Sequence, residues 1–319
     1  MWGSTPEIQA QSDRLANIML DPLLLLPDFL LILGGFLLCR FTAFGRPTWD
    51  VVERLVYHLL FPALLFASIV RSPLQPGDAA ALAGGGVALC LLGLLLATLL
   101  RHWPGVDARM HASGAQVAFR FNSYIALALA DRLLGAEGVA LIAILIALCV
   151  PLCNAGAVWS LARHGGHNIW MEIARNPLII GTLAGLTVRV LGLPLPSWAV
   201  ETVSRIGQAA LPLGLLAVGA GLKLTGLTAA PGLAASLLVI RHLVLPLAAI
   251  GLGWALALPD AQRAILVAFG ALPTASSAYV LAVRMGGHGP FVAGLITLST
   301  LLGMVTVPMW ISVLRQVSG

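Results

Sequence analysis

Long apolar stretches, separated by short connections rich in glycine, proline or polar residues, follow one another along almost the whole chain. Each stretch approaches the roughly 20 apolar residues that a helix needs to cross the hydrocarbon core of a bilayer. None of the connections is long enough for a soluble domain. This pattern predicts an all-α polytopic membrane protein with ten transmembrane helices, preceded by a polar N-terminal tail at residues 1–21. We expect the helices at about residues 22–39, 50–70, 78–100, 112–134, 137–162, 172–191, 198–222, 231–257, 261–285 and 289–314.

Composition agrees with this pattern and excludes some partners. Of the 319 residues, 59% are hydrophobic and 10% are charged, and the mean hydropathy is +0.95; soluble domains average about 25% charged. The net charge of +5 comes from arginines scattered at segment ends, which fits membrane anchoring better than a nucleic-acid-binding patch. We therefore expect a multi-pass protein of the cell inner (plasma) membrane, surrounded by the lipid bilayer and with no nucleic-acid partner. A slight excess of basic residues on one side favours extracytoplasmic termini.

The two halves of the chain share short matches at a nearly constant offset. The matches, with shifts of 150, 150 and 151 residues, are Val117-Ala118-Phe119 with Val267-Ala268-Phe269, Phe61-Pro62-Ala63 with Leu211-Pro212-Leu213, and Gly135 with Gly286. They divide the predicted helices into two sets of five. Because five is odd, the second set must enter the membrane in the opposite orientation, so the offset predicts an inverted-topology repeat.

Residues 267–279 contain a proline, Pro273, followed by three hydroxyl residues inside an apolar segment. A proline at this position removes a backbone donor and clashes with the preceding turn. Such a break is tolerated in hydrocarbon only where protein or a water-filled cavity surrounds it. The offset pairs it with residues 120–124, so we expect these two stretches to be corresponding features of the two repeats. Pro62 and Pro212 are further candidates for helix breaks.

Several side chains in these two stretches could bind a ligand or repair the interrupted backbone. Arg120 would offer a guanidinium to an anionic substrate, or else pair with a carboxylate or with backbone carbonyls. Asn122 provides donors and an acceptor for either purpose, and the hydroxyls after Pro273 can also do both. The candidate substrate-binding residues are Arg120, Asn122, Ser123, Pro273, Thr274, Ala275, Ser276 and Ser277.

Three other polar side chains are candidates for substrate contact or gating. Arg241 is either a paired structural charge or a group that attracts substrate or forms a gating ion pair. His58, one helical turn before Pro62, is either a hydrogen-bonded structural histidine or a pH-responsive group. Gln208, four residues before Pro212, is a candidate polar contact from the second half.

Motifs that would indicate an enzyme or a bound metal are absent from the sequence. There is no GxxxxGK[ST] loop, no HExxH and no GxSxG elbow. The cysteines lie in apolar segments without metal-site spacing and are interpreted as small buried side chains. We expect no enzymatic activity, no metal site and no cofactor, while coupling to Na⁺ or H⁺ stays open.

Four stretches resemble bacterial members of the auxin efflux carrier family, which includes malonate transporters. They are residues 57–68, 120–124, 210–220 and 272–282, which are similar to the family's second, fourth, seventh and ninth spans. The resemblance covers nearly the whole chain after residue 22 and is specific for the family, not for a substrate. Phe121 stands where plant members carry a proline, and Asn122 keeps the position of their asparagine.

The resemblance implies ten spans in two inverted five-helix repeats, at residues 22–163 and 172–315. Helices 1, 2, 6 and 7 would form a scaffold that could also mediate a homodimer. Helices 3–5 and 8–10 would form a transport domain, in which broken helices four and nine cross near the midplane beside the substrate. We therefore expect a secondary transporter for a small organic anion such as a carboxylate, with elevator-like alternating access. The alternatives are a sodium-coupled organic anion symporter of the bile-acid-symporter type and, less favoured, a ligand-sensing membrane protein or a channel.

Overall fold

The computed structural model describes residues 26–71, 79–161, 177–222, 230–275 and 277–318. Over these ranges the chain forms α-helices with short 3-10 and π segments, and no β-strand. The all-α class predicted from the sequence is therefore confirmed for the described residues. The predicted tail at residues 1–21 and the candidate site residue Ser276 lie outside them.

The first half of the chain contains one long helix and several shorter ones. In chain order the elements are α2 (Leu26–Phe41), α3 (Arg46–Leu55), η1 (Val56–Leu60), α4 (Phe61–Arg71), α5 (Ala80–Leu99), η3 (Leu100–His102), α6 (Ala108–Gly114), α7 (Gln116–Phe119) and α8 (Ser123–Leu161). Gly135 lies inside α8 with φ 58° and ψ −139°, a conformation that costs glycine little. It divides α8 into two helices joined at a kink.

The second half repeats a similar succession of elements. They are α10 (Pro177–Val190), α11 (Ser197–Gln208), α12 (Ala210–Ala220), α13 (Pro231–Val239), η5 (Ile240–Val244), α14 (Leu245–Ala255), α15 (Asp260–Ala271), α16 (Ser277–Arg284) and α17 (Gly289–Ser318). Gly286, between α16 and α17, has a positive φ of 71°. Two of these helices begin with a proline, whose fixed φ and missing N–H suit the first helical position.

Six helical ranges among the described residues are long and apolar enough to cross a membrane. They are Arg46–Arg71, Ala80–His102, Ala108–Leu161, Ser197–Ala220, Pro231–Ala255 and Gly289–Val317. The third range is interrupted at residues 120–122 and again at Gly135. Length and composition thus indicate a multi-pass membrane protein, while the count of ten spans, the inverted repeat and the orientation remain predictions.

Each π-helical segment ends two residues before a proline. Pro246 has no N–H, and its ring clashes with the carbonyl of His242 four residues earlier. The wider π turn accommodates the ring, and the His242 carbonyl accepts a hydrogen bond from Trp310 Nε1 at 2.8 Å. Pro62 likewise follows a π segment, η1. The proline does not interrupt the helix here, since α4 continues directly from η1. Pro212 lies in the first turn of α12, just after the short break that ends α11.

Glycines allow two pairs of helices to approach closely. α2 packs against α12, and α10 packs against α4. A Cβ atom at Gly35 would overlap the carbonyl oxygen of Leu216, and a Cβ atom at Gly185 would lie 3.2 Å from the carbonyl oxygen of Phe66. Small residues are typical of such contacts between membrane helices, where packing has to replace a hydrophobic driving force.

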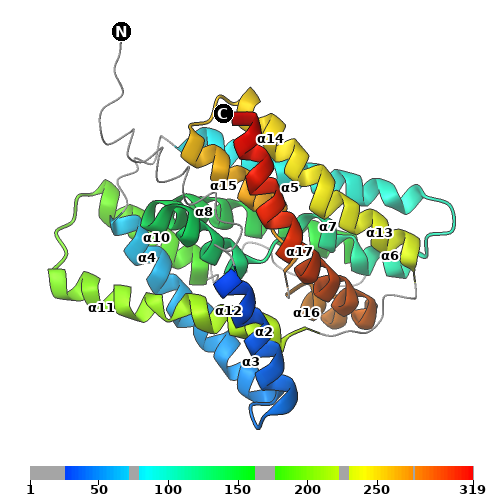
Figure 1. The fold of residues 1–319 in the computed structure, drawn as a ribbon, viewed down its shortest axis with the longest axis horizontal. Coiled ribbons are helices and arrows are strands. Elements are labelled where there is room, and N and C mark those ends of the chain that lie inside the picture. Colours follow the sequence, from blue (N-terminus) through cyan, green and yellow to red (C-terminus); the bar gives the residue numbers. More distant parts are fainter. Residues whose placement is uncertain (1–25, 72–78, 162–176, 223–229, 276, 319) are drawn as a thin grey trace.

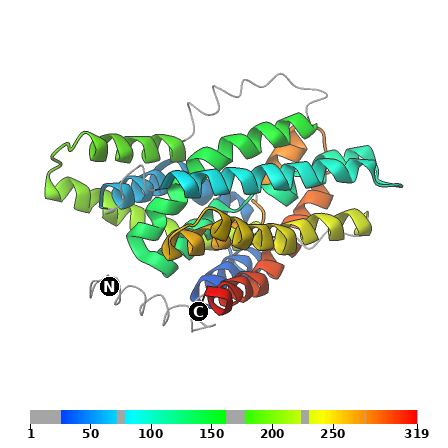
Figure 2. The same cartoon turned by 90° about the horizontal axis from the view of Figure 1, so that it is seen from above.

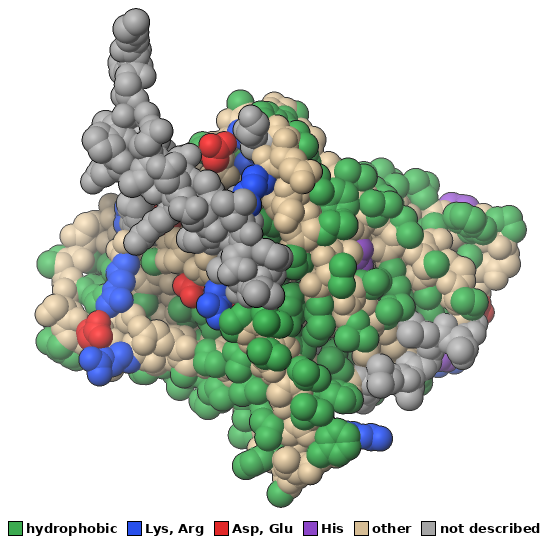
Figure 3. All heavy atoms as spheres, viewed as in Figure 1, with side chains coloured by type: hydrophobic (Ala, Val, Ile, Leu, Met, Phe, Trp, Pro, Cys, Tyr) green, Lys and Arg blue, Asp and Glu red, His purple; other side chains and the backbone are tan. Residues whose placement is uncertain are grey.

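The helices form two neighbouring groups. Figures 1 and 2 show α4, α10 and α11 toward one end of the molecule and α5, α6 and α13 toward the other. Hydrophobic side chains are spread over much of the face drawn in Figure 3, and one group of charged side chains lies over α11. There Glu201 of α11 pairs with Arg71 of α4 and with Arg205, each at 3.0 Å. The largest fully buried side chains include Phe61, Phe119 and Phe269.

Candidate functional site

Two interrupted helices meet in the interior through a backbone hydrogen bond. Residues 120–122 between α7 and α8 are not helical, and neither are residues 272–275 after α15. The N–H of Asn122 donates to the carbonyl oxygen of Pro273 at 2.9 Å. The two stretches are therefore in direct contact although about half of the chain separates them.

Two side chains from the first stretch reinforce this contact. Arg120 Nη2 donates to Ser277 Oγ at 3.0 Å, and Gln116 Nε2 donates to the carbonyl oxygen of Ala278 at 3.1 Å. Arg120 Nη1 also donates to Gln116 Oε1 at 3.2 Å. Gln116 is fully buried and Arg120 is 8% exposed, so the two bonds of Gln116 are buried, while the bond to the exposed Ser277 is partly buried. They connect the end of α7 to the first turn of α16.

The break between α7 and α8 arises without a proline. Asn122 Oδ1 accepts hydrogen bonds from the N–H groups of Tyr124 at 3.0 Å and Ile125 at 3.3 Å. An asparagine in this position is a favourable N-cap, because it satisfies donors that the new helix leaves unpaired. Phe121 packs edge-on against Phe269 of α15, with ring centroids 4.6 Å apart. The break is therefore stabilised by a cap and by an aromatic contact.

The break after α15 is fixed by a proline and by contacts with α17. Leu272 is already extended, with φ −56° and ψ 142°, and Pro273 cannot donate to a preceding carbonyl. A Cβ atom at Gly303 would lie 3.3 Å from the Pro273 ring, so a small residue there makes room for the proline. The N–H of Thr274 donates to Ser299 Oγ at 3.0 Å, which holds the extended segment against α17.

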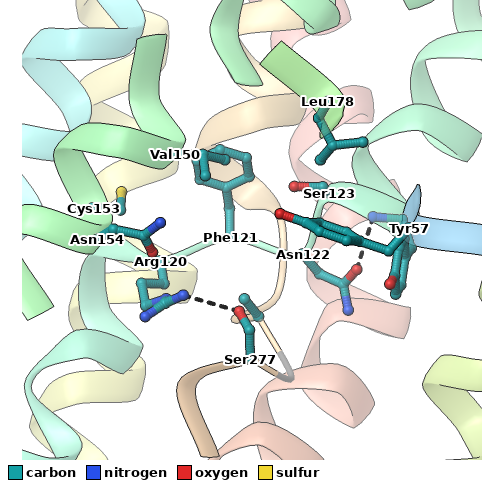
Figure 4. Close-up of a pocket in the computed structure, with 12 residues that line it drawn as sticks. Tyr57, Arg120, Phe121, Asn122, Ser123, Val150, Cys153, Asn154, Leu178 and Ser277 are labelled. Carbon is teal, nitrogen blue, oxygen red and sulfur yellow. Dashed lines mark hydrogen bonds between the residues drawn. The ribbon is translucent and has the colours of Figure 1, made fainter. Parts of the chain in front are cut away.

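A cavity of about 250 Å³ lies beside this contact (Figure 4). Its walls combine apolar side chains with amides, hydroxyls and one guanidinium. The lining residues are Tyr57, Arg120, Phe121, Asn122, Ser123, Tyr124, Val150, Cys153, Asn154, Leu178, Ala275 and Ser277. Among these described residues there is no Asp or Glu, so the only formal charge on the wall is positive.

Helix ends add to this positive character. Ser123 and Ser277 are the first residues of α8 and α16, and both line the cavity. The N-terminus of a helix carries a partial positive charge and unpaired N–H groups. Arg120 lies beside Asn154 and is hydrogen-bonded to Ser277, the first residue of α16 (Figure 4). The site is therefore suited to an anion.

Two polar atoms at the contact lack a hydrogen-bond partner among the described residues. They are Asn122 Nδ2 and Thr274 Oγ1, in side chains that are 2% and 0% exposed. Leaving a buried donor unpaired costs roughly 1–3 kcal/mol. Because Asn122 lines the cavity, its Nδ2 group is a donor that an occupant of the cavity could satisfy.

The structure brings together five of the predicted substrate-binding residues. Arg120, Asn122, Ser123, Ala275 and Ser277 line the cavity. Pro273 and Thr274 lie behind it: Pro273 bonds to Asn122 through its carbonyl, and Thr274 is buried against α17.

The other three candidates lie outside the cavity lining. His58 is exposed, and its Nδ1 atom lies 3.0 Å from the carbonyl oxygen of Arg54. Gln208 is exposed at the end of α11. Arg241 is buried, 2% exposed, and bonds to carbonyl groups at the end of α15. No ion pair among the described residues includes Arg241, so the pairing with a carboxylate that was one alternative is not seen there.

Four polar side chains of the cavity were not among the sequence candidates. They are Tyr57, Tyr124, Cys153 and Asn154. Asn154 lies beside Arg120 in Figure 4, although it is 34 residues further along the chain (154 − 120). A signal for it existed, because Asn154 is the only amide side chain in the apolar segment 137–162.

Comparison with known proteins assigns the chain to a group of membrane proteins. A family model described as "Membrane transport protein" matches residues 140–311. The matched range contains the second of the two interrupted helices and the C-terminal half of α8, including Cys153 and Asn154.

Relatives similar over almost their full length are named as transporters. The chain is 28% identical over 302 residues to a protein of Rhizobium meliloti (strain 1021) named "Putative malonate transporter", covering 89% of this chain and 92% of the relative. It is 25% identical over 291 residues to an "Uncharacterized transporter" of Methanothermobacter thermautotrophicus, covering 89% and 95%. It is 24% identical over 311 residues to the "Uncharacterized transporter YfdV" of Escherichia coli (strain K12), covering 92% and 98%.

Proposed function

Because the chain belongs to the auxin efflux carrier family of membrane transport proteins, we propose that it is a secondary transporter for a small organic anion. The observation that carries this proposal is the convergence of Arg120, the Asn122 amide and the N-termini of α8 and α16 on one cavity. The transporter would act in the cell inner membrane, by alternating access.

The cavity is chemically suited to a carboxylate. A guanidinium and helix N-termini stabilise negative charge, and Asn122 Nδ2 supplies a donor that is otherwise unpaired among the described residues. The volume of about 250 Å³ is below the roughly 300–1,000 Å³ of pockets for drug-sized ligands, so it favours a small metabolite. A relative named as a putative malonate transporter makes a short dicarboxylate the first substrate to test.

The proposal includes ten spans in two inverted repeats, which the helix packing supports. Gly35 of α2 meets the Leu216 carbonyl of α12, and Gly185 of α10 meets the Phe66 carbonyl of α4. The two contacts are related by a shift of 150 residues in both partners (185 − 35 and 216 − 66), with the order of the halves exchanged. An exchange of this kind is what a two-fold relation between repeats produces.

We further propose an elevator-like movement of one helix group against the other. The scaffold would contain α2, α3, α4, α10, α11 and α12, and the transport domain would contain α5 to α8 and α13 to α17. The cavity lies between η1 and α10 on one side and α8 on the other, since Tyr57 of η1 and Leu178 of α10 belong to the scaffold group and the remaining lining residues to the transport domain. Movement between these groups would carry the cavity past the scaffold.

Uptake by proteoliposomes tests the proposal. We expect the purified protein to take up labelled malonate or another short carboxylate with saturation and counterflow, which distinguish a carrier from a channel. Asn122→Ala should reduce uptake strongly. Thr187→Ala is the matched control, because this exposed hydroxyl bonds to its own helix at Leu183 O, 2.8 Å away. The proposal fails if no mono- or dicarboxylate is transported, or if flux does not saturate.

A further inference from the structure

Arg241 is a fully buried cation that the proposed cavity does not use. It lies on η5 and is 2% exposed. Its Nε atom donates to the carbonyl oxygen of Leu272, and its Nη2 atom donates to the carbonyl oxygen of Phe269 at 3.1 Å. In the part of the chain that the structure describes, backbone carbonyls are thus its hydrogen-bond acceptors.

These acceptors belong to the C-terminal end of an interrupted helix. α15 ends at Ala271, so no following helical turn donates to the carbonyls of its last turn or of the extended Leu272. The Phe269 carbonyl accepts a long capping hydrogen bond from the Leu272 N–H, at 3.4 Å, in addition to the bond from Arg241. The C-terminus of a helix carries a partial negative charge that a cation stabilises. In secondary transporters, unwound carbonyls and the C-terminal ends of half-helices are the groups that coordinate a coupling Na⁺.

We propose that Arg241 is a built-in counter-cation, which occupies the carbonyl groups at the α15 C-terminus that a coupling Na⁺ would otherwise use. Transport through this crossing would then need no Na⁺. This inference rests on the proposed function as a carrier, and it assigns Arg241 a positioning and ion-specificity role, since its bonds are to the broken helix.

The neighbouring contacts hold Arg241 in place. His242 lies between Ser299 Oγ, 2.8 Å from Nε2, and Thr306 Oγ1, 3.0 Å from Nδ1. Ser299 Oγ also accepts the hydrogen bond from the N–H of Thr274 in the extended segment. The η5 segment is therefore held against α17 and, through Ser299, against the break itself, which positions Arg241 beside the end of α15.

The corresponding end in the first half has no such cation. The shift of 150 residues places Leu91 at the position equivalent to Arg241 (241 − 150), and this leucine is 47% exposed. The last carbonyl of α7, at Phe119, accepts only a weak hydrogen bond from Cys153 Sγ, at 3.3 Å, among the bonds seen in the described residues. Among the described residues, a fixed cation is therefore seen at the end of α15 and not at the end of α7.

The variant Arg241→Ala tests the inference. It keeps the carbonyl groups of Phe269 and Leu272 and removes the guanidinium, which leaves a space in which a small cation fits. Melting temperature in detergent is measured in choline chloride, NaCl and a low, non-denaturing concentration of guanidinium chloride. We expect wild type to melt at the same temperature in NaCl and choline chloride. Arg241→Ala should melt lower in choline and be raised selectively by guanidinium or Na⁺.

Arg109→Ala is the matched control for this measurement. Arg109 also donates two hydrogen bonds to a backbone carbonyl after a helix end, that of Gly286, at 3.2 and 2.9 Å, but it is exposed. We expect no cation-specific recovery for this variant. The inference is overturned if neither cation raises the melting temperature of Arg241→Ala, or if Na⁺ stabilises the wild type. The wild-type measurement decides the question even if Arg241→Ala does not fold.

Transport provides a second readout that separates this inference from the proposed function. Replacing Na⁺ by choline should leave wild-type uptake unchanged, while Arg241→Ala should lose about tenfold or more of its uptake and regain part of it with guanidinium. Wild-type uptake that needs Na⁺ overturns the role of Arg241 but leaves the carrier intact. A wild type that transports no carboxylate refutes the proposed function, and the melting experiment still tests the cation.

Discussion

Replacing Asn122 by aspartate separates the two roles of this side chain. Its Oδ1 atom caps α8 by accepting from the N–H groups of Tyr124 and Ile125, at 3.0 and 3.3 Å. Its Nδ2 atom is buried at the cavity without a partner among the described residues. Aspartate caps helices about as well as asparagine, and the N-terminus of α8 favours its charged form. Asn122→Asp should therefore keep the cap and replace the donor by a charged acceptor.

The expected loss of substrate affinity is large compared with the loss of stability. A hydrogen bond to a charged ligand contributes about 1.5–3 kcal/mol, which corresponds to roughly 10- to 150-fold in affinity. Repulsion between the new carboxylate and an anionic substrate about 4 Å away adds about 4 kcal/mol at an effective dielectric constant near 20. Uptake at subsaturating malonate should thus fall by more than about a hundredfold. Asn122→Ala should in addition lose about 1 kcal/mol of stability, because it removes the cap.

Thermal unfolding in detergent and uptake by proteoliposomes measure the two effects separately. We expect Asn122→Asp to unfold close to the wild-type temperature and to be inactive, and Asn122→Ala to be impaired in both. Asn122→Ser, a neutral capping residue, should retain stability and more uptake than the aspartate variant. If Asn122→Asp took up malonate at the rate of the wild type, the amide would not contact the substrate. Unfolding of Asn122→Asp at the temperature of Asn122→Ala would refute the capping argument.

Three further predictions concern the cavity wall and the helix contacts. Cys153 lines the cavity, so a small anionic thiol reagent should label it and substrate should slow the labelling; equal rates with and without substrate would contradict the site. Gly35→Ala would push a Cβ atom into a backbone carbonyl of α12. It should reduce the free energy of unfolding by about 1–3 kcal/mol and so lower the melting temperature. Gly34→Ala should have little effect, because the atom nearest to a Cβ there is a side-chain carbon at 3.6 Å. Asp28 of α2 and Arg132 of α8 form an ion pair of 3.3 Å, which the proposed movement of the transport domain would break. Asp28→Asn should change turnover by up to roughly fivefold, since a partly exposed pair contributes about 1 kcal/mol or less. Additive effects of Asp28→Asn and Arg132→Gln in a double-mutant cycle would show that the pair does not affect transport.

Much of the helical class and of the contact between the two stretches could be inferred from sequence alone. The length of the apolar runs predicts the helical class, because within the hydrocarbon core a single segment can pair all of its backbone groups only as a helix. The offset of 150 residues aligned Asn122 with Leu272, and in the structure Asn122 donates to the neighbouring residue, Pro273. Periodicity could not show the depth of this contact in a membrane, which remains a prediction.

Other features depended on three-dimensional contacts that local sequence does not encode. No proline lies in residues 120–122, yet they are non-helical, and Asn122 caps the helix that follows. Asn154 reaches the cavity only because α8 kinks at Gly135 and returns. Each of these outcomes depends on packing between segments that are distant in the chain.

The placement of Arg241 shows why a buried charge is difficult to assign from sequence. Its position in an apolar segment left two interpretations open, a paired structural charge and a substrate or gating contact, and in the structure it bonds to backbone carbonyls at the end of α15. The two buried arginines of the described residues thus lie at opposite helix ends. Arg241 is a permanent partner for a negative C-terminus, whereas Arg120 and the N-termini of α8 and α16 leave a positive potential at the cavity. In the proposed carrier, an anion entering the cavity would balance that potential, while the other end would need no exchangeable ion. A broken helix with a fixed partner at one end and an exchangeable partner at the other would suit an anion carrier that uses no cation as a co-substrate.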